Sequence, residues 1–579
     1  MPHRAHLFSL RIAHALRESY SEGYSSSSLV KDCMAGCVVG LIAIPLAMAL
    51  AIASGVPPQY GLYTAIIAGF LIAITGGSRY SISGPTAAFV VILHPLVTQH
   101  GMAGLLIASI MAGVILVLMS YARLGRFIEY IPQSVTLGFT GGIGIVIATL
   151  QIPDFFGLPV QGLPEHYYEK ILTIAEHITA IDFGSFIVAT FTLILMLLWP
   201  KLKTPVPAHL PAIVLASLLT VWLNDNGYVI DTIGTRFQFL DEDGVLGYGI
   251  PSVLPHFEWP WLRSDLGDTN FIFSWATIVD LLPSAFVIAM LGAIESLLCA
   301  VVLDGMSGKR HSANSELLGQ GIGNIVAPFF GGITATAAIA RSAANYKAGA
   351  QSPIASVVHA LVVLLALVFF ASLLGYLPMP AVAALLLVVA WNMSEAPKSV
   401  HLVKSSPTGD IAVFVTCISL TVWFDMVIAI STGILLASML FMREIASMTK
   451  VIDITGNEKF LSAPLPQNWK AFKVNGPLFF AAADRLFGEI NEELKHLDGV
   501  VLYMEAVPIL DAGGLAAMSK LMTAHADSGK KIYFADWQFQ PLKTLAKAKV
   551  QPVDGAIRFF SSLAEVSNHL TKTGNNEVI

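Results

Sequence analysis

The sequence predicts an α-helical membrane protein followed by a small α/β domain. Charged residues make up only 12% of the chain and hydrophobic residues 55%, whereas soluble proteins carry about 25% charged residues. Several apolar runs reach the length of about 20 residues that crosses a bilayer, and the composition becomes that of a soluble protein after Arg443. We therefore expect a cytoplasmic N-terminal segment (1–31), a transmembrane domain (32–443), a linker (444–467) and a C-terminal domain (468–579).

The apolar pattern divides the transmembrane domain into about fourteen segments. The third and tenth are short and rich in Gly, Ser and Thr, so we do not expect either to span the membrane alone. The segments lie near 33–54, 58–75, 84–99, 103–121, 131–151, 182–200, 207–223, 276–303, 316–330, 336–347, 353–376, 379–394, 410–424 and 426–442.

Basic residues predict the orientation of these segments. If the N-terminus is cytoplasmic, most loop lysines and arginines lie inside, and only Lys170, Arg236 and Arg263 lie outside, as the positive-inside rule requires. An even number of spans then returns the C-terminal domain to the cytoplasm. The four cysteines form no C-x-x-C pair, and the sequence contains no metal cluster, nucleotide loop or nucleophile–base pattern. We expect no enzyme activity, no cofactor and no nucleic-acid partner.

A short motif occurs in both the third and the tenth segment. Residues 82–88 and 332–338 both end in Thr-Ala-Ala. Their positions correspond if seven spans are repeated, and because seven is odd, the second copy is inverted. Inverted repeats with interrupted helices are typical of transporters that bind substrate near the midplane.

Both motifs look like helix starts, with Pro85 in a first helical turn. Two facing helix N-termini would present free N–H groups and positive dipole ends to an anion. Tight helix packing is the alternative explanation for such small residues.

Two charged side chains lie in or near these segments. Glu295 is isolated in an apolar span, where a carboxylate is costly unless it is paired, hydrated or protonated. It is either a proton- or cation-coupling group or half of a fixed ion pair. Arg341, at the start of the tenth segment, either attracts an anion, anchors a helix end or pairs with Glu295.

The C-terminal domain alternates strand and helix patterns. Strands are expected at 471–474, 499–504 and 531–535, and helices at 482–497, 514–526 and 541–548. Asp511 precedes the second of these helices and is expected to cap it.

Several motifs together resemble the SulP family of anion transporters, whose members carry a C-terminal STAS domain. The resemblance covers nearly the whole chain. It rests on Pro58-x-Tyr60-Gly61-Leu62-Tyr63, Gly84-Pro85-Thr86-Ala87, Ile294-Glu295-Ser296-Leu297-Leu298, residues 314–321, Arg341-Ser342-Ala343-x-Asn345 and, in the STAS domain, Leu510-Asp511-Ala512-Gly513-Gly514.

The resemblance implies a seven-plus-seven inverted repeat with core and gate domains, alternating access and a homodimer in a bacterial inner membrane. It places the substrate between the starts of the third and tenth segments, where we expect the site to be formed by Gly84, Pro85, Thr86, Ala337, Ala338, Ile339 and Arg341. The isolation of Glu295 in an apolar span makes it the expected proton-coupling group.

Within the family, residues 43–51 and 390–396 resemble enterobacterial transporters of four-carbon dicarboxylates. This resemblance implies proton-coupled uptake of succinate, fumarate or aspartate, and points to acyl carrier protein as a cytoplasmic partner of the STAS domain. The alternatives are a sulfate or bicarbonate transporter, an anion channel, or a regulatory scaffold built on the STAS domain.

The chain departs from relatives at informative positions. Sodium-coupled bicarbonate members carry Asp where Glu295 stands, and Thr at the positions of Cys299 and Ile339. Because sodium prefers several oxygen ligands, these replacements argue against sodium coupling. Soluble STAS proteins carry a phosphorylatable Ser at the position of Gly513, which has no hydroxyl, so we expect no phosphorylation switch there.

Overall fold

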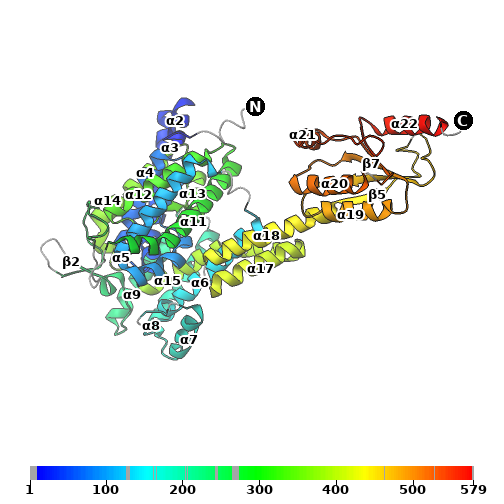
Figure 1. Cartoon of the computed structure of the whole chain (residues 1–579). Coiled ribbons are helices and arrows are strands. Elements are labelled where there is room, and N and C mark those ends of the chain that lie inside the picture. The colour runs from blue at the N-terminus through cyan, green and yellow to red at the C-terminus, as the bar shows by residue number, and fades with distance from the viewer. Residues whose placement is uncertain are drawn as a thin grey trace. The chain divides into compact units, whose positions relative to one another are not determined.

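The computed structural model describes residues 10–576 except 126–130, 161, 165, 203, 205, 241–245, 264–272, 425, 462 and 527. The chain forms two compact units, Met1–Ile434 and Leu435–Ile579. The first contains the apolar helices and the second contains a β-sheet with helices (Figure 1).

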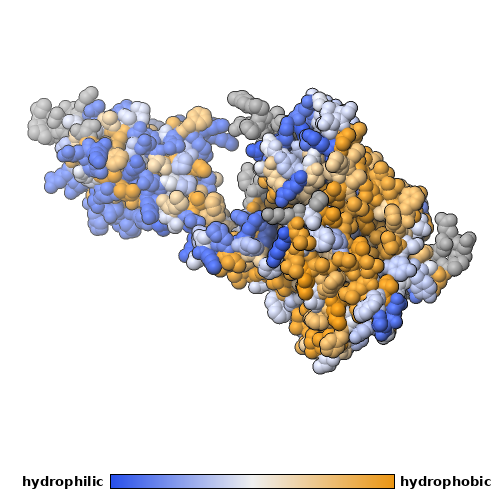
Figure 2. All heavy atoms as spheres, turned by 180° about the vertical axis from the view of Figure 1, so that it is seen from behind, coloured by the Kyte–Doolittle hydropathy of each residue, from blue (hydrophilic) through white to orange (hydrophobic). Residues whose placement is uncertain are grey.

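The first unit has the surface of a membrane protein. Among the described residues, nine helices are long and apolar enough to cross a bilayer. Large apolar side chains such as Phe183, Leu197, Phe369 and Trp391 are exposed, and Figure 2 shows apolar side chains over a broad area of this unit. Contiguous exposed apolar surface of this extent requires a nonaqueous partner, which here is lipid.

Each predicted membrane segment has a helical counterpart in the described residues. The third and fourth segments form one long helix, α5, which breaks at Gly101 (φ 65°, ψ −171°), a conformation that glycine adopts without strain. The helices are α3 (Ser26–Ala53), α4 (Pro58–Thr75), α5 (Ala87–Tyr121), α6 (Gln133–Phe156), α8 (Phe183–Leu198), α9 (His209–Asp225), α11 (Trp275–Ser307), α12 (Ala313–Val326), α13 (Ile339–Lys347), α14 (Ile354–Leu374), α15 (Met379–Met393), α17 (Thr408–Trp423) and α18 (Met426–Met448).

Several shorter elements are absent from the sequence-based prediction. The helix α3 begins at Ser26, where Ser25 accepts a hydrogen bond from the backbone of Ser28 (3.2 Å), so it starts earlier than expected. The additional elements are α2 (His14–Ser21), α7 (Tyr167–His177), α10 (Ile233–Arg236), α16 (Ala396–Ser405) and the hairpin of β2 (Gln238–Leu240) with β3 (Leu246–Tyr248).

The helices pack as two groups, which can be followed in Figure 1. The core group comprises α3, α4, α5, α11, α12, α13 and α14, and the gate group includes α6, α8, α9, α15 and α17. In a repeat of seven segments, α3 and α14 correspond to α11 and the second half of α5, and α6 and α17 correspond to α15 and α8. The contact between α3 and α14 therefore corresponds to that between α11 and α5, and the contact between α6 and α17 to that between α15 and α8. All four contacts are present. This correspondence is what a seven-plus-seven inverted repeat requires.

The second unit contains a five-stranded sheet in the order β5-β6-β7-β8-β9. The strands β6 to β9 are parallel, and β5 pairs antiparallel with β6. The strand β5 lies in the predicted linker, and β9 and α22 are also additions to the prediction. The elements are β5 (Lys450–Asp453), β6 (Trp469–Asn475), α19 (Ala483–Leu494), β7 (Gly499–Ala506), α20 (Ala512–His525), β8 (Lys531–Ala535), α21 (Phe539–Lys547), β9 (Ile557–Phe560) and α22 (Leu563–Asn576).

Alternate residues of the strands pack on opposite faces of this sheet. Val500 and Leu502 lie in the cluster with α19 and α20, whereas Val501 lies in the cluster with α22. Asp511 caps α20 as predicted, because its Oδ1 accepts a hydrogen bond from the backbone N–H of Gly514 (2.7 Å).

Candidate anion-binding site

The two Thr-Ala-Ala motifs meet inside the membrane unit. Strand β1 (Ser83–Gly84) pairs antiparallel with β4 (Thr336–Ala337), with Ser83 opposite Ala337 and Gly84 opposite Thr336. The expected helix starts are therefore displaced: Pro85 precedes α5 and does not lie in its first turn, and Thr336 and Ala337 are extended. Hydrogen bonds between the two segments take the place of helical ones there. The antiparallel pairing agrees with an inverted repeat.

Two helices begin directly after these strands. Thr86 is the N-cap residue of α5 and Ala338 is that of α13, and neither side chain caps its helix. The first N–H groups of an α-helix have no partner within the helix. The two uncapped helices therefore begin next to a pair of hydrogen-bonded strands, and the positive ends of both helix dipoles lie in the same region.

Arg341 lies in the first turn of α13 and is 3% exposed. Its Nη2 donates a hydrogen bond to the carbonyl oxygen of Pro85 (2.6 Å). Its Nε and Nη1 are buried and have no hydrogen-bond partner among the described residues. The structure thus contains a cation with unused donors at this junction, and one donor that anchors the segment before α5.

Glu295, on α11, contacts Thr86, the residue that follows Pro85. Its Oε2 accepts a hydrogen bond from Oγ1 of Thr86 (3.0 Å). Arg341 and Glu295 thus bind consecutive residues, Pro85 and Thr86. Among the described residues, the two charged groups do not form an ion pair with each other within 4 Å. The fixed ion pair that the sequence left open is therefore absent from this conformation.

Exposure divides the predicted site residues into two groups. Gly84, Pro85, Thr86, Ala337 and Arg341 are buried, whereas Glu295, Ala338 and Ile339 are half-buried. All eight belong to the junction of α5, α11 and α13, and the half-buried residues give this junction its accessible side.

Side chains not singled out in the sequence hold the two strands in place. Ser296, next to Glu295, bonds Oγ1 of Thr336 (2.6 Å), and Thr336 donates to the carbonyl of Gly292 (3.1 Å). The hydroxyl of Ser342 accepts from the backbone N–H of Ile82 (2.9 Å). In the sequence, Ser296 directly follows Glu295 and Ser342 directly follows Arg341, and these adjacent hydroxyl residues could have indicated their role.

A second carboxylate, Glu316, is also buried in the membrane unit. It is 1% exposed and accepts hydrogen bonds from the backbone N–H groups of Gly77 and Ser78 (both 2.9 Å) and from Gln320 (3.0 Å). Because Oε2 is occupied by the turn after α4 and Oε1 by Gln320 of its own helix, its geometry is that of a structural group.

The described residues contain no group of three or more His, Cys, Asp or Glu that could hold a metal ion. Cys299 is fully buried in an apolar cluster with Ala35, Tyr80 and Ala337, against which Ile339 packs. An isoleucine and a buried thiol at these two positions supply no oxygen ligand.

Comparisons with known proteins agree with this architecture. The sequence model of the "Sulfate permease family" matches residues 29–417, and that of the "STAS domain" matches residues 461–566. A protein of Bacillus subtilis (strain 168), "Putative sulfate transporter YvdB", is 37% identical over 548 residues, which cover 94% of this chain and 98% of the relative.

Solved structures of other transport proteins are also similar to this chain. The transmembrane domain of a cyanobacterium bicarbonate transporter, BicA, has a TM-score of 0.60 and 26% identity, covering 70% of this chain and 98% of that chain. The overall structure of SLC26A9 has a TM-score of 0.80 and 16% identity, covering 97% and 93%. At 16% identity the second comparison shows the fold alone, including the combination of helical membrane unit and C-terminal domain.

Proposed function

Because the chain belongs to the sulfate permease (SulP) family, and is thus an anion transporter with a C-terminal STAS domain, we propose that it takes up four-carbon dicarboxylates together with protons. Succinate, fumarate and aspartate are the proposed substrates. The chain is not an enzyme; its relatives are transporters.

The unused donors of Arg341 support the anion-binding part of this proposal. A buried guanidinium with unpaired Nε and Nη1 is costly, and it lies beside two uncapped helix N-termini. A carboxylate bound between Gly84–Thr86 and Ala337–Ile339 would satisfy these donors. Arg341 would supply the charge, and the N–H groups of both helices would supply the remaining hydrogen bonds.

Glu295 is the proposed proton carrier. Its carboxylate already lies at the N-terminus of α5, bonded to Thr86, where a substrate anion would bind. Two negative charges at one site repel each other, so anion binding is favoured when Glu295 is protonated. Proton uptake and anion binding thereby favour each other, which is the requirement for symport.

The energetics also favour coupling. A dianion that enters a negative interior opposes the potential by about 2.3 kcal/mol per charge at 100 mV, hence about 4.6 kcal/mol in total. Two or more co-transported protons would remove this opposition. The side chains of Cys299 and Ile339 argue for protons over sodium as the coupling ion.

A sulfate or bicarbonate transporter is the second candidate function. The names of similar proteins support it: a putative sulfate transporter in Bacillus subtilis and a cyanobacterial bicarbonate transporter. The dicarboxylate proposal rests on sequence resemblance in 43–51 and 390–396 and on the coupling argument. The two candidates share the anion site and differ in what occupies it.

Uptake by proteoliposomes distinguishes the candidates. Purified full-length protein is reconstituted, and uptake of labelled succinate, sulfate and bicarbonate is measured with and without an inwardly directed proton gradient. We expect saturable, gradient-dependent accumulation of succinate. Accumulation of sulfate or bicarbonate without succinate would replace the main proposal by the second, and non-saturable flux without accumulation would indicate a channel.

We further propose a homodimer in the bacterial inner membrane, with the N-terminus and the STAS domain in the cytoplasm. The orientation follows from the distribution of basic loop residues. The STAS domain would regulate or assemble the transporter, with acyl carrier protein as a candidate partner.

A further inference from the structure

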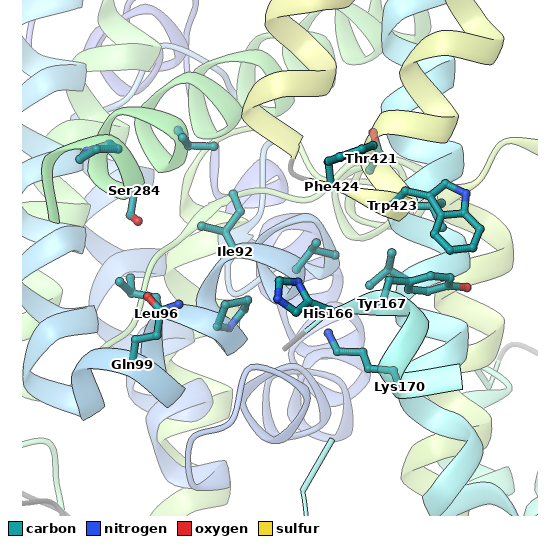
Figure 3. Close-up of a pocket in the computed structure, with 16 residues that line it drawn as sticks. Ile92, Leu96, Gln99, His166, Tyr167, Lys170, Ser284, Thr421, Trp423 and Phe424 are labelled. Carbon is teal, nitrogen blue, oxygen red and sulfur yellow. The ribbon is translucent and has the colours of Figure 1, made fainter. Parts of the chain in front are cut away.

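The membrane unit contains a cavity of about 340 Å³ outside the predicted site. It lies between the first half of α5 and the helices α6, α7, α11 and α17 (Figure 3). Its first lining residue on α5, Val91, comes more than one helical turn after Thr86. The same helix therefore carries the candidate substrate site at its N-terminus and one wall of this cavity further along.

The topology puts this cavity on the outer side. With a cytoplasmic N-terminus, α6 ends outside, α7 follows it in an outer loop, and α11 begins outside. The cavity is lined by Tyr167 of α7 and by Pro283 and Ser284 near the start of α11. It also lies between a core-group helix, α5, and a gate-group helix, α6, so it is positioned on the outer route to the candidate site.

One wall of the cavity is cationic. Lys170, on the first turn of α7, lines it with only 7% of its surface exposed. Figure 3 shows its amine directed into the space beside His166, which also lines the cavity. The amide of Gln99 and the hydroxyl of Ser284 complete the polar part of the lining. These groups can all donate hydrogen bonds to an oxyanion.

The opposite part of the cavity is apolar. Ile92 and Leu96 of α5, Val146 of α6 and Val287 of α11 contribute aliphatic side chains. An inorganic oxyanion such as sulfate gains nothing from such a surface. A short carboxylate with a carbon backbone gains from both surfaces, since its charge meets Lys170 and its methylene groups meet the aliphatic wall.

We propose that this cavity is an outer binding site for short organic carboxylates, in which Lys170 binds the carboxylate before the anion reaches Arg341. The inference rests on the proposed function for its place on the transport route. Binding in the cavity is a separate property, and it can be measured without transport.

A cysteine protection experiment tests this binding. Ser284→Cys introduces a thiol on the cavity wall, and a membrane-impermeant maleimide is added from the outside to full-length protein in right-side-out vesicles. The parent protein gives the background labelling of the native cysteines. We expect succinate to slow labelling of the new thiol. Relative to Ser284→Cys alone, the half-protecting concentration should rise about tenfold or more when Lys170→Gln is added and stay nearly the same when Lys170→Arg is added.

Three controls separate this inference from the proposed function. Protection is repeated in the Arg341→Ala background, where it is expected to persist even though transport is impaired. Arg236→Gln removes an outer cation that pairs with Asp154 and does not line the cavity, and it is expected to leave protection unchanged. Failure of succinate uptake with intact protection would overturn the proposed function only.

Other outcomes overturn the outer site itself. Absence of protection by succinate, or protection unaffected by Lys170→Gln, would refute it. Equal protection by sulfate and succinate would refute its preference for organic anions.

Discussion

Replacing Arg341 by alanine tests the candidate site at the residue with the clearest unmet hydrogen-bonding capacity. The guanidinium is 3% exposed and uses Nη2 on the carbonyl of Pro85, while Nε and Nη1 have no partner among the described residues. Removing one partner of a buried hydrogen bond, which leaves the other group unsatisfied, costs about 1–3 kcal/mol. Loss of the substrate contact should therefore weaken binding by about 1–3 kcal/mol, or about 5- to 150-fold in Kd.

The assay is equilibrium binding of the labelled substrate to purified protein in nanodiscs. Arg341→Lys keeps the charge but loses the planar donor set, so we expect its affinity to lie between those of the parent and Arg341→Ala. Arg79→Ala is a matched control, because Arg79 is also buried but pairs with Glu18 and Glu22. It should lower thermal stability and leave Kd unchanged.

An unchanged Kd for Arg341→Ala would refute the anion-binding role. If the thermal midpoint also fell, the side chain would act only as an anchor for Pro85. A lower affinity in Arg341→Ala with unchanged affinity in Arg79→Ala would support the proposed site.

Three further predictions follow from named contacts. Gly84→Ala adds a methyl group about 3.1 Å from Nη1 of Arg341, so we expect substrate binding to weaken by about 1–3 kcal/mol. Gly305→Ala is the control, because its methyl group meets nothing within 4 Å, and it should bind substrate normally. Equal affinities of the two variants would show that the Arg341 guanidinium moves freely. Asp511→Ala removes the cap of α20 and should lower the stability of the STAS domain by about 1 kcal/mol, measured by chemical denaturation of the STAS unit in the full chain; no change would mean that the cap contributes nothing. Truncation after Lys450 should reduce the uptake rate or the dimer fraction more than substrate affinity, and an intact rate with altered substrate preference would contradict a regulatory role for the STAS domain.

The sequence is informative about the membrane helices because length and apolarity are local properties. The expected third and tenth segments proved to be a strand followed by a helix, and their shared Thr-Ala-Ala motif correctly indicated corresponding positions. The displacement of both helix starts was not predictable from propensity. It depends on pairing between Gly84 and Thr336, which are distant in the sequence.

The connections within the site are also tertiary. The Thr86–Glu295 and Pro85–Arg341 hydrogen bonds join residues that only the folded chain brings together. The amphipathic helix α7 was missed because it is too short and polar for a membrane span. Its Lys170 was recognised only as an outer basic residue, and the cavity that it lines has no signal in the sequence.

Proton-driven uptake by Glu295→Gln tests whether the Glu295 carboxyl group carries the coupled proton. The glutamine keeps the size of the side chain and a carbonyl oxygen that can accept the Thr86 hydroxyl, but it cannot carry a proton. Each coupled proton contributes about 2.3 kcal/mol at 100 mV, so the loss of one coupled proton lowers the attainable accumulation ratio about 50-fold. In proteoliposomes with an imposed proton gradient, we expect the variant to lose gradient-driven accumulation and to retain some exchange of labelled for unlabelled substrate. Accumulation that still follows the proton gradient as in the parent protein would rule out Glu295 as the proton carrier.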